Sequence, residues 1–163
     1  MDAERIAMEQ CRKMLRGQKT PLGRIEGGHS MARICVLDDD LDGVALIQRI
    51  LTRKGHLVRV FTAEEEAVAY ASRHRVDLAL VDSDFGGMNG GIGMLEAFKR
   101  IGSPLRVIIL AQYPTNVLAK QAREAGAADY CIKPVDKSEL ERKVAAVLAT
   151  GLGQQHITQE LVP

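Results

Sequence analysis

The sequence predicts an α/β fold of three layers, in which helices cover both faces of one open, parallel β-sheet. Two observations support this prediction. Between residues 33 and 149, short apolar segments alternate with helix-like segments five times. Four of the five apolar segments contain almost no polar residue, which is typical of parallel strands that are covered on both faces. Strand–helix–strand units of this kind join parallel strands by right-handed crossovers.

The composition is that of one globular domain with short appendages. The chain has 163 residues, of which 46% are hydrophobic and 26% are charged, and this balance is unlike that of a disordered chain. The formal net charge is +1, so no overall field draws the protein toward nucleic acid or anionic lipid. No apolar run is long enough to span a membrane, and the charged N-terminus lacks the apolar stretch of a secretory signal. We therefore expect a cytoplasmic protein.

Each predicted strand is a short apolar run. Arg59 interrupts one of these runs, so the strand that contains it suits an edge of the sheet. The predicted strands are Ile34–Leu37, Leu57–Phe61, Leu78–Val81, Val107–Leu110 and Tyr130–Ile132.

The segments between and after the strands have apolar residues at helical spacing. Gly55 and Gly126 each follow one of these segments and suit the left-handed residue that ends a helix. The apolar stripes are Val44, Ile47, Ile50 and Leu51; Met94, Leu95 and Phe98; Val117, Leu118 and Ala122; and Leu140, Val144 and Val147.

Two helices have a predicted cap at their start. Thr62 with Glu65, and Asp136 with Glu139, have the three-residue spacing of a capping box. In that motif, side chains satisfy the backbone N–H groups of the first helical turn. We therefore expect helices to begin after Thr62 and after Asp136.

Residues 31–150 form the predicted domain, and both ends of the chain differ from it. Within residues 1–30, apolar side chains recur at helical spacing as far as Leu15, and a stretch rich in glycine and proline follows. This pattern predicts a short amphipathic helix and a linker. The segment has too little positive charge to indicate a nucleic-acid-binding tail. Residues 151–163 are the predicted C-terminal tail.

The three cysteines give no sign of a zinc or redox site. Cys11, Cys35 and Cys131 lie far apart and form no Cys-x-x-Cys pair. Because Cys35 and Cys131 lie inside predicted strands, we expect buried free thiols in a reducing compartment.

Charged residues follow three of the strands at the point where each strand ends. In an open α/β sheet, ligands bind beyond the carboxyl ends of the strands. Crowded carboxylates repel one another unless a cation neutralises them, and Mg²⁺ is a hard cation that prefers oxygen ligands. We therefore expect an acidic, cation-binding pocket with an ammonium group beside it. The residues concerned are Asp38, Asp39 and Asp40 after the first strand, Asp82, Ser83 and Asp84 after the third, and Lys133 and Pro134 after the fifth.

Each of these residues also has an ordinary structural explanation. Asp40 suits the N-cap of the following helix, Asp82 suits the start of a turn, and Lys133 suits a solvated loop. Taken singly, each explanation is about as good as a functional one. Three strands that end in this way at one edge would require three coincidences, so we favour a shared site.

Between residues 31 and 149 the chain contains, in this order, the stretches RICVLDDDLDG, VDLALVDSDFGGMNG and AGAADYCIKPVDKSEL. These stretches and their order resemble the signature motifs of response-regulator receiver domains, the phosphoacceptor modules of two-component signalling. The resemblance implies the flavodoxin-like (βα)5 sandwich, with its strands in the order 2-1-3-4-5. That order also places the strand with Arg59 at an edge.

The resemblance implies a role for each residue of the acidic pocket. Asp82 resembles the phosphoacceptor, which is also a ligand of Mg²⁺. Asp39 resembles the direct ligand of the metal, and Asp38 the acidic residue that acts on the metal through water. The backbone carbonyl of Asp84 matches a further metal contact. Lys133 resembles the lysine that pairs with the phosphoryl oxygens.

The same resemblance implies a switch and a partner. The Lys133–Pro134 peptide bond is expected to be cis, and Tyr130 matches the aromatic residue whose rotamer reports activation. The implied phosphoryl donor is a phosphohistidine on a sensor histidine kinase or a histidine phosphotransfer protein. A receiver of this kind catalyses only its own phosphorylation and dephosphorylation, and it signals by contact with another protein.

The sequence departs from the family pattern at three places. Ala111 stands where the family has a Thr or Ser whose hydroxyl contacts the phosphoryl group. We therefore expect a weak or altered conformational response even when Asp82 is modified, and Gln112 and Ser83 are poor substitutes for the missing hydroxyl. The side chain of Asp84 is expected near the phosphoryl position, where it tunes the lifetime of the modification. Third, glycines gather in the loop after the phosphoacceptor, which favours a mobile or unusually shaped turn that acts as a lid. They are Gly86, Gly87, Gly90, Gly91 and Gly93.

Three classes of function fit these features. The favoured class is a phosphorylation switch, either a single-domain regulator or a fragment of a longer protein, because only residues 150–163 follow Ala149. A pseudo-receiver, an interaction module that no longer switches, is favoured by Ala111. A phosphatase similar to the haloacid dehalogenases is suggested by the Asp-x-Asp of Asp82 and Asp84, although that family has its motif on the first strand. We expect no direct contact with nucleic acid or membrane.

Overall fold

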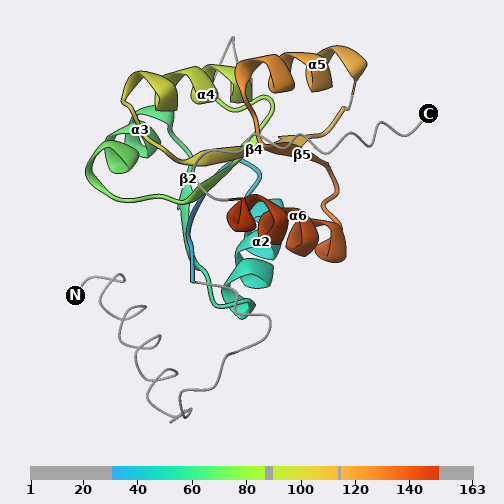
Figure 1. Cartoon of the computed structure of the whole chain (residues 1–163). Helices are drawn as coiled ribbons and strands as arrows, with labels where there is room; N and C mark the ends of the chain where they lie inside the picture. The colour runs from blue at the N-terminus through green and yellow to red at the C-terminus, as the bar shows by residue number, and fades with distance from the viewer. Residues whose placement is uncertain (1–30, 87–89, 114, 151–163) are drawn as a thin grey trace.

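The structure is a computed structural model that describes residues 31–86, 90–113 and 115–150. The helix predicted within residues 1–30 and the tail at 151–163 lie outside these described residues. One parallel sheet of five strands has the order β2-β1-β3-β4-β5, which confirms the predicted order (Figure 1). Every strand boundary is within one residue of its predicted position. The strands are β1 (Arg33–Leu37), β2 (Leu57–Phe61), β3 (Leu78–Asp82), β4 (Arg106–Ala111) and β5 (Asp129–Ile132).

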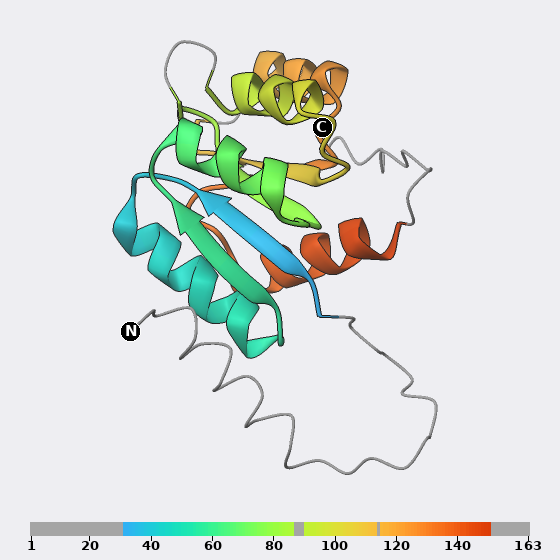
Figure 2. The ribbon, with the colours of Figure 1, turned by 90° about the vertical axis from the view of Figure 1, so that its left-hand side faces the viewer.

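Helices cover both faces of the sheet and confirm the predicted three layers. Helices α2 and α6 pack on one face, whereas α3, α4 and α5 pack on the other (Figures 1 and 2). Each face has its own cluster of buried apolar side chains, because successive residues of a strand point to opposite faces. The helices are α2 (Leu41–Arg53), α3 (Glu64–Arg73), α4 (Gly90–Arg100), α5 (Asn116–Ala125) and α6 (Lys137–Ala149).

The two edges of the sheet are β2 and β5. The edge position of β2 confirms the prediction from Arg59, whose guanidinium carbon lies 4.6 Å from the centre of the Tyr70 ring. The expectation that β5 is covered on both faces is wrong, because Ile132 at its end is exposed. The predicted run for β5 had only three residues, too few to show the alternation that distinguishes a half-exposed strand.

Three of the predicted helix ends are confirmed. The carboxylate of Asp136 accepts a hydrogen bond from the backbone N–H of Glu139 (2.9 Å) and so caps α6. Gly55 and Gly126 have φ values of 88° and 94° after α2 and α5, a backbone conformation that favours glycine.

Two predictions about helices are wrong. The N-cap of α3 is Ala63 and not Thr62, and this cap makes no side-chain hydrogen bond. Glutamates fill the first turn of α3, where negative charge stabilises the positive end of the helix dipole. Val117 was predicted to face the core, but it is 65% exposed, and Ala122 is the buried residue of α5.

The two cysteines within the described residues, Cys35 and Cys131, are buried free thiols, as predicted. Burial raises the pKa of each thiol to about 12. Cys11 lies outside the described residues. None of the helices that the structure describes is long and apolar enough to cross a membrane.

Candidate functional site

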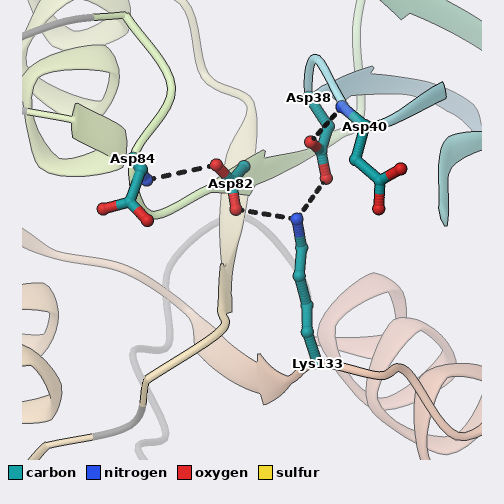
Figure 3. A network of polar contacts seen from close by, with 5 residues as sticks. All are labelled: Asp38, Asp40, Asp82, Asp84 and Lys133. Atoms are coloured by element: carbon teal, nitrogen blue, oxygen red, sulfur yellow. Dashed lines mark hydrogen bonds and ion pairs between the residues drawn. The ribbon is translucent and has the colours of Figure 1, made fainter.

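Three strands end at the same edge of the sheet and bring the predicted polar residues together (Figure 3). Asp38 directly follows β1, Asp82 is the last residue of β3, and Lys133 directly follows β5. The preceding residues of β1 and β3 are buried apolar side chains, which fix these strands in the core. The rigid sheet therefore sets the positions of the three polar groups.

Lys133 lies between two buried carboxylates. Its Nζ atom is 2.6 Å from Oδ2 of Asp38 and 2.8 Å from Oδ1 of Asp82, and Figure 3 shows its side chain reaching between them. Asp38 is only 1% exposed and Asp82 only 6%. Two buried negative groups thus share one positive group.

Burial and charge pairing have opposite effects on the pKa values of Asp82 and Lys133. Burial raises the pKa of Asp82, the hydrogen bond from Lys133 lowers it, and the net shift is upward. Burial alone would lower the pKa of Lys133, but the hydrogen bonds to Asp38 and Asp82 outweigh burial and raise it. The ammonium of Lys133 is therefore stabilised, and additional positive charge would favour the ionised form of Asp82.

The backbone holds both buried carboxylates in place. The N–H of Asp40 donates to Oδ1 of Asp38 (2.9 Å), and the N–H of Asp84 donates to Oδ2 of Asp82 (3.2 Å). Asp40 occupies the N-cap of α2, but its side chain makes no capping hydrogen bond. The expectation that Asp40 occupies the N-cap of α2 is therefore confirmed, but its side chain does not make the hydrogen bond that a capping residue usually makes.

Asp39 completes an acidic cluster that suits a divalent cation. Its side chain is exposed, and one oxygen atom each of Asp38, Asp39 and Asp82 lies within 4.8 Å of the others. Three carboxylates and one ammonium leave an excess of negative charge, and the donor atoms are all oxygen, as Mg²⁺ prefers. The residues present therefore fit the expected metal. The exposed carboxylate of Asp84 lies on the side of Asp82 away from Lys133 (Figure 3).

Glycines allow α4 to start against the end of β3. The N–H of Gly91 donates to the carbonyl of Ser83 (2.9 Å). A Cβ atom at Gly90, where φ is 52°, would lie only 1.9 Å from the Ser83 carbonyl oxygen. Gly90, Gly91 and Gly93 belong to α4, so the turn is shorter than the run of glycines. Gly86 and Gly90 have φ values of 84° and 52°, as an unusually shaped turn requires, and the mobility of the turn stays a prediction. Gly87 lies outside the described residues.

Comparison with known proteins agrees with this geometry. Residues 34–145 match the family model of the response regulator receiver domain. The chain belongs to this family. Receiver domains are in general signalling modules rather than enzymes, and they bind Mg²⁺ at an acidic pocket.

The relatives of this receiver domain are longer proteins. The chain is 30% identical to the transcriptional regulatory protein ZraR of Escherichia coli O157:H7 over 135 residues, which cover 83% of the chain and 30% of ZraR. It is 31% identical to the DNA-binding transcriptional regulator NtrC of Azospirillum brasilense, covering 73% of the chain and 24% of NtrC. The chain thus spans less than a third of either relative.

Solved structures of receiver domains have the same fold. A CheY-like receiver domain protein from Methanospirillum hungatei JF-1 is similar with a TM-score of 0.65 and 28% identity, covering 73% of this chain and 94% of that one. The receiver domain of a LuxO repressor protein from Vibrio parahaemolyticus has a TM-score of 0.68, covering 73% and 91% of the two chains. Its identity is 21%, so this second likeness concerns the fold alone.

In this receiver domain, β4 contributes a backbone carbonyl to the neighbourhood of Lys133. Ala111, the last residue of β4, is fully buried, and its carbonyl accepts a hydrogen bond from the N–H of Lys133 (2.8 Å). Its methyl group offers no hydrogen-bond donor. The Lys133–Pro134 peptide bond is cis, the configuration that the resemblance implied.

Lys143 is a neighbour of Tyr130 that the sequence analysis missed. The Nζ atom of Lys143 lies 5.2 Å from the centre of the half-buried Tyr130 ring, donates to the Tyr130 carbonyl, and pairs with Glu139 at 2.9 Å. Burial alone would lower the pKa of Lys143, but the hydrogen bond to Glu139 and nearby negative charge raise it. The four-residue spacing of Glu139 and Lys143 on a helix predicts their ion pair, but it does not predict the contact of Lys143 with Tyr130.

Proposed function

We propose that Asp82 accepts a phosphoryl group from a phosphohistidine of a partner histidine kinase or phosphotransfer protein, in a reaction that depends on Mg²⁺. The supporting observation is the position of Lys133, whose Nζ lies 2.8 Å from Asp82 and 2.6 Å from Asp38. An ammonium held beside the acceptor oxygen can pair with an incoming phosphoryl oxygen.

In the proposed reaction, an oxygen of Asp82 attacks the phosphorus atom. A P–O bond forms, the N–P bond of the phosphohistidine breaks, and the bonding electron pair stays on the imidazole nitrogen. Because carboxylate and phosphoryl oxygens repel each other, positioning and charge neutralisation supply most of the catalysis. Lys133 neutralises one side of the transferred group. Asp38, Asp39, Asp82 and the Asp84 carbonyl would hold Mg²⁺, which when bound neutralises phosphoryl charge.

We also propose bounds, a cellular location and an output for the receiver. We assign the receiver unit to residues 31–150, with residues 1–30 as an N-terminal extension and 151–163 as a tail. A cytoplasmic location is supported by the buried free thiols of Cys35 and Cys131, which suit a reducing compartment. The output acts through a protein target or through a linked domain like those of the longer relatives.

Ala111 supports a second candidate function. Without a hydroxyl at the end of β4, the phosphoryl group lacks the usual contact that would pull this segment inward. A pseudo-receiver would keep the acidic pocket and serve as an interaction module with weak switching or none.

One experiment separates these functions. The protein is incubated with a small phosphodonor, with and without Mg²⁺, and its intact mass is measured beside those of Asp82→Asn and Asp40→Asn variants. Asp40 is a matched control, because it lies at the same rim and its side chain makes no capping bond. A gain of one phosphoryl group that needs Mg²⁺ and Asp82, but not Asp40, supports the switch.

Other outcomes point elsewhere. Mg²⁺ binding with no phosphoryl gain supports the pseudo-receiver. Repeated hydrolysis of small phosphate esters, many per protein molecule, would support the phosphatase alternative.

A further inference from the structure

Strand β5 is an edge of the sheet, and side chains from both faces meet around it (Figure 1). The ring of Tyr130 packs against the apolar cluster on the face that α3, α4 and α5 cover. Lys143 belongs to α6, which packs on the opposite face. Its Nζ atom nevertheless lies 5.2 Å from the centre of the Tyr130 ring. The Lys143 side chain therefore reaches this ring around the free edge of β5 and joins the two helical layers.

Charged side chains bond both backbone polar groups of Tyr130. Its N–H donates to Oδ1 of Asp129 (2.8 Å), and its carbonyl accepts from Nζ of Lys143. The same oxygen atom of Asp129 lies 3.7 Å from that Nζ atom, and a carboxylate oxygen of Glu139 lies 2.9 Å from it. We name Asp129, Glu139 and Lys143 together the β5 edge clamp.

Lys143 is enclosed much more than an ordinary surface lysine. Only 13% of its side chain is exposed, whereas the side chain of Lys137 on the same helix is 67% exposed. Lysines are rarely buried unless they are paired, and ordering so long a side chain costs conformational entropy. The ion pairs, the carbonyl and the ring together offset that cost, so the ammonium has a fixed place beside Tyr130.

A fixed ammonium beside an aromatic ring also fixes the ring. The face of the ring carries partial negative charge, so it attracts a cation that lies within about 6 Å of its centre. Tyr130 is half-buried, and its side chain has only a few staggered positions about χ1. The position that keeps the ring beside Lys143 is therefore favoured over positions that turn the ring out into solvent.

We propose that Lys143 is the positioning residue of Tyr130 and holds the ring in its half-buried place from α6, without a hydroxyl on β4. Asp129 and Glu139 hold the ammonium where the ring needs it. The β5 edge clamp contains none of the groups proposed to accept a phosphoryl group. The inference therefore applies to the unmodified protein and does not rest on the proposed function.

Fluorine NMR tests the proposal in the absence of Mg²⁺ and of any phosphodonor. The full chain is labelled with meta-fluorotyrosine at its three tyrosines, Tyr70, Tyr113 and Tyr130, and a Tyr130→Phe variant assigns the signal of Tyr130. A neutral gadolinium chelate then broadens the signals of exposed rings. Tyr113, which is 75% exposed, is the reference for such a ring. We expect the signal of Tyr130 to broaden less than that of Tyr113.

Variants of Lys143 separate the charge from the hydrogen bond. Lys143→Met should shift the Tyr130 signal and broaden it further, as the ratio of half-buried to solvent-exposed ring positions falls about two- to fivefold. Lys143→Arg keeps the charge and should give the wild-type signal. Lys143→Gln keeps a donor for the carbonyl but no charge, and should resemble the methionine variant. Lys137→Met is the matched control on the same helix and should change nothing.

Far-UV circular dichroism and unchanged signals of Tyr70 and Tyr113 check that each variant folds. Lys143→Gln supplies the comparison if the methionine variant does not fold. The proposal is overturned if the Tyr130 signal is unchanged in Lys143→Met, or if Lys137→Met changes it equally. It is also overturned if Lys143→Gln gives the wild-type signal, because Lys143 would then act only through its hydrogen bond to the strand.

Discussion

Replacement of Lys133 by methionine removes the one ammonium that two buried carboxylates share. Methionine keeps most of the side-chain length but has no charge, so Asp38 and Asp82 lose their contacts of 2.6 and 2.8 Å. Breaking a fully buried ion pair typically costs about 3–5 kcal/mol. Because the Lys133 side chain is 16% exposed, we expect a smaller loss than for a fully buried pair, namely a fall of about 2–3 kcal/mol in the free energy of unfolding in the absence of Mg²⁺.

The loss of unfolding free energy in the Lys133→Met variant should become smaller as the pH falls. Burial raises the pKa of Asp82 and the hydrogen bond from Lys133 holds it back, so in the variant that pKa is raised further. A carboxyl group whose pKa is higher in the folded state binds its proton more readily there, and stability is gained as it protonates. The deficit of the variant relative to the wild type should therefore shrink as the pH falls from neutrality toward the ordinary carboxyl range of about 4.

Urea unfolding followed by far-UV circular dichroism measures this loss, since the chain contains no tryptophan. The control is Lys120→Met, because Lys120 is exposed and its partner Glu124 lies 3.8 Å away; such a pair contributes at most about 1 kcal/mol. Mg²⁺ at one hundred times its dissociation constant should return about 2.7 kcal/mol to the variant. Equal stability of Lys133→Met and Lys120→Met at neutral pH without Mg²⁺ would refute this reasoning.

Backbone space, the β4 hydroxyl and thiol burial give three more predictions. Gly90→Ala should lower the free energy of unfolding by about 2–4 kcal/mol, because the added Cβ would lie 1.9 Å from a carbonyl oxygen. The control is Gly102→Ala, whose Cβ would have no heavy atom within 4 Å and which should cost about 1 kcal/mol. Equal losses of the two variants in urea unfolding would contradict this prediction. Ala111→Thr should enlarge the NMR shifts caused by Mg²⁺ and a phosphoryl analogue, and identical shifts would count against a role for the missing hydroxyl. Once the cysteine of the N-terminal extension is replaced, Cys35 and Cys131 should react with a thiol reagent at about pH 8 only in denaturant, because burial raises the pKa of each to about 12.

The sheet and its acidic edge were predictable because they depend on the order of buried strands. Asp38 and Lys133 are 95 residues apart in the sequence, yet both directly follow an apolar run. The carboxyl ends of parallel strands meet at one edge, so the strand order alone brings these side chains together. No knowledge of side-chain rotamers was needed for that prediction.

Features that depend on local competition were not predictable. Thr62 has the spacing of a capping box, but α3 starts one residue later than this box requires and its cap has no side-chain bond. Val117 fits a helical stripe, but α5 buries only Ala122. The contact of Lys143 with Tyr130 depends on where a long side chain turns, and sequence spacing does not determine that direction.

The glycines after β3 show what composition alone leaves open. A cluster of glycines indicates either freedom of movement or lack of space, and the two have the same sequence signature. Here the space between α4 and the end of β3 decides, because Gly90 and Gly91 lie where a side chain would overlap the backbone of Ser83 or Asp82. The same close approach fixes the backbone next to the proposed phosphoacceptor.

Acceptance of a phosphoryl group and response to it depend on different strands of this sheet. The groups proposed for acceptance come from the ends of β1, β3 and β5, where Lys133 already pairs with Asp38 and Asp82. The usual response needs a hydroxyl on β4, and Ala111 provides only a carbonyl bonded to the Lys133 backbone. Loss of that hydroxyl leaves the charges that govern acceptance unchanged. We therefore expect this protein to be modified readily and to change shape little, which suits a phosphoryl carrier or recognition by a partner through a fixed surface.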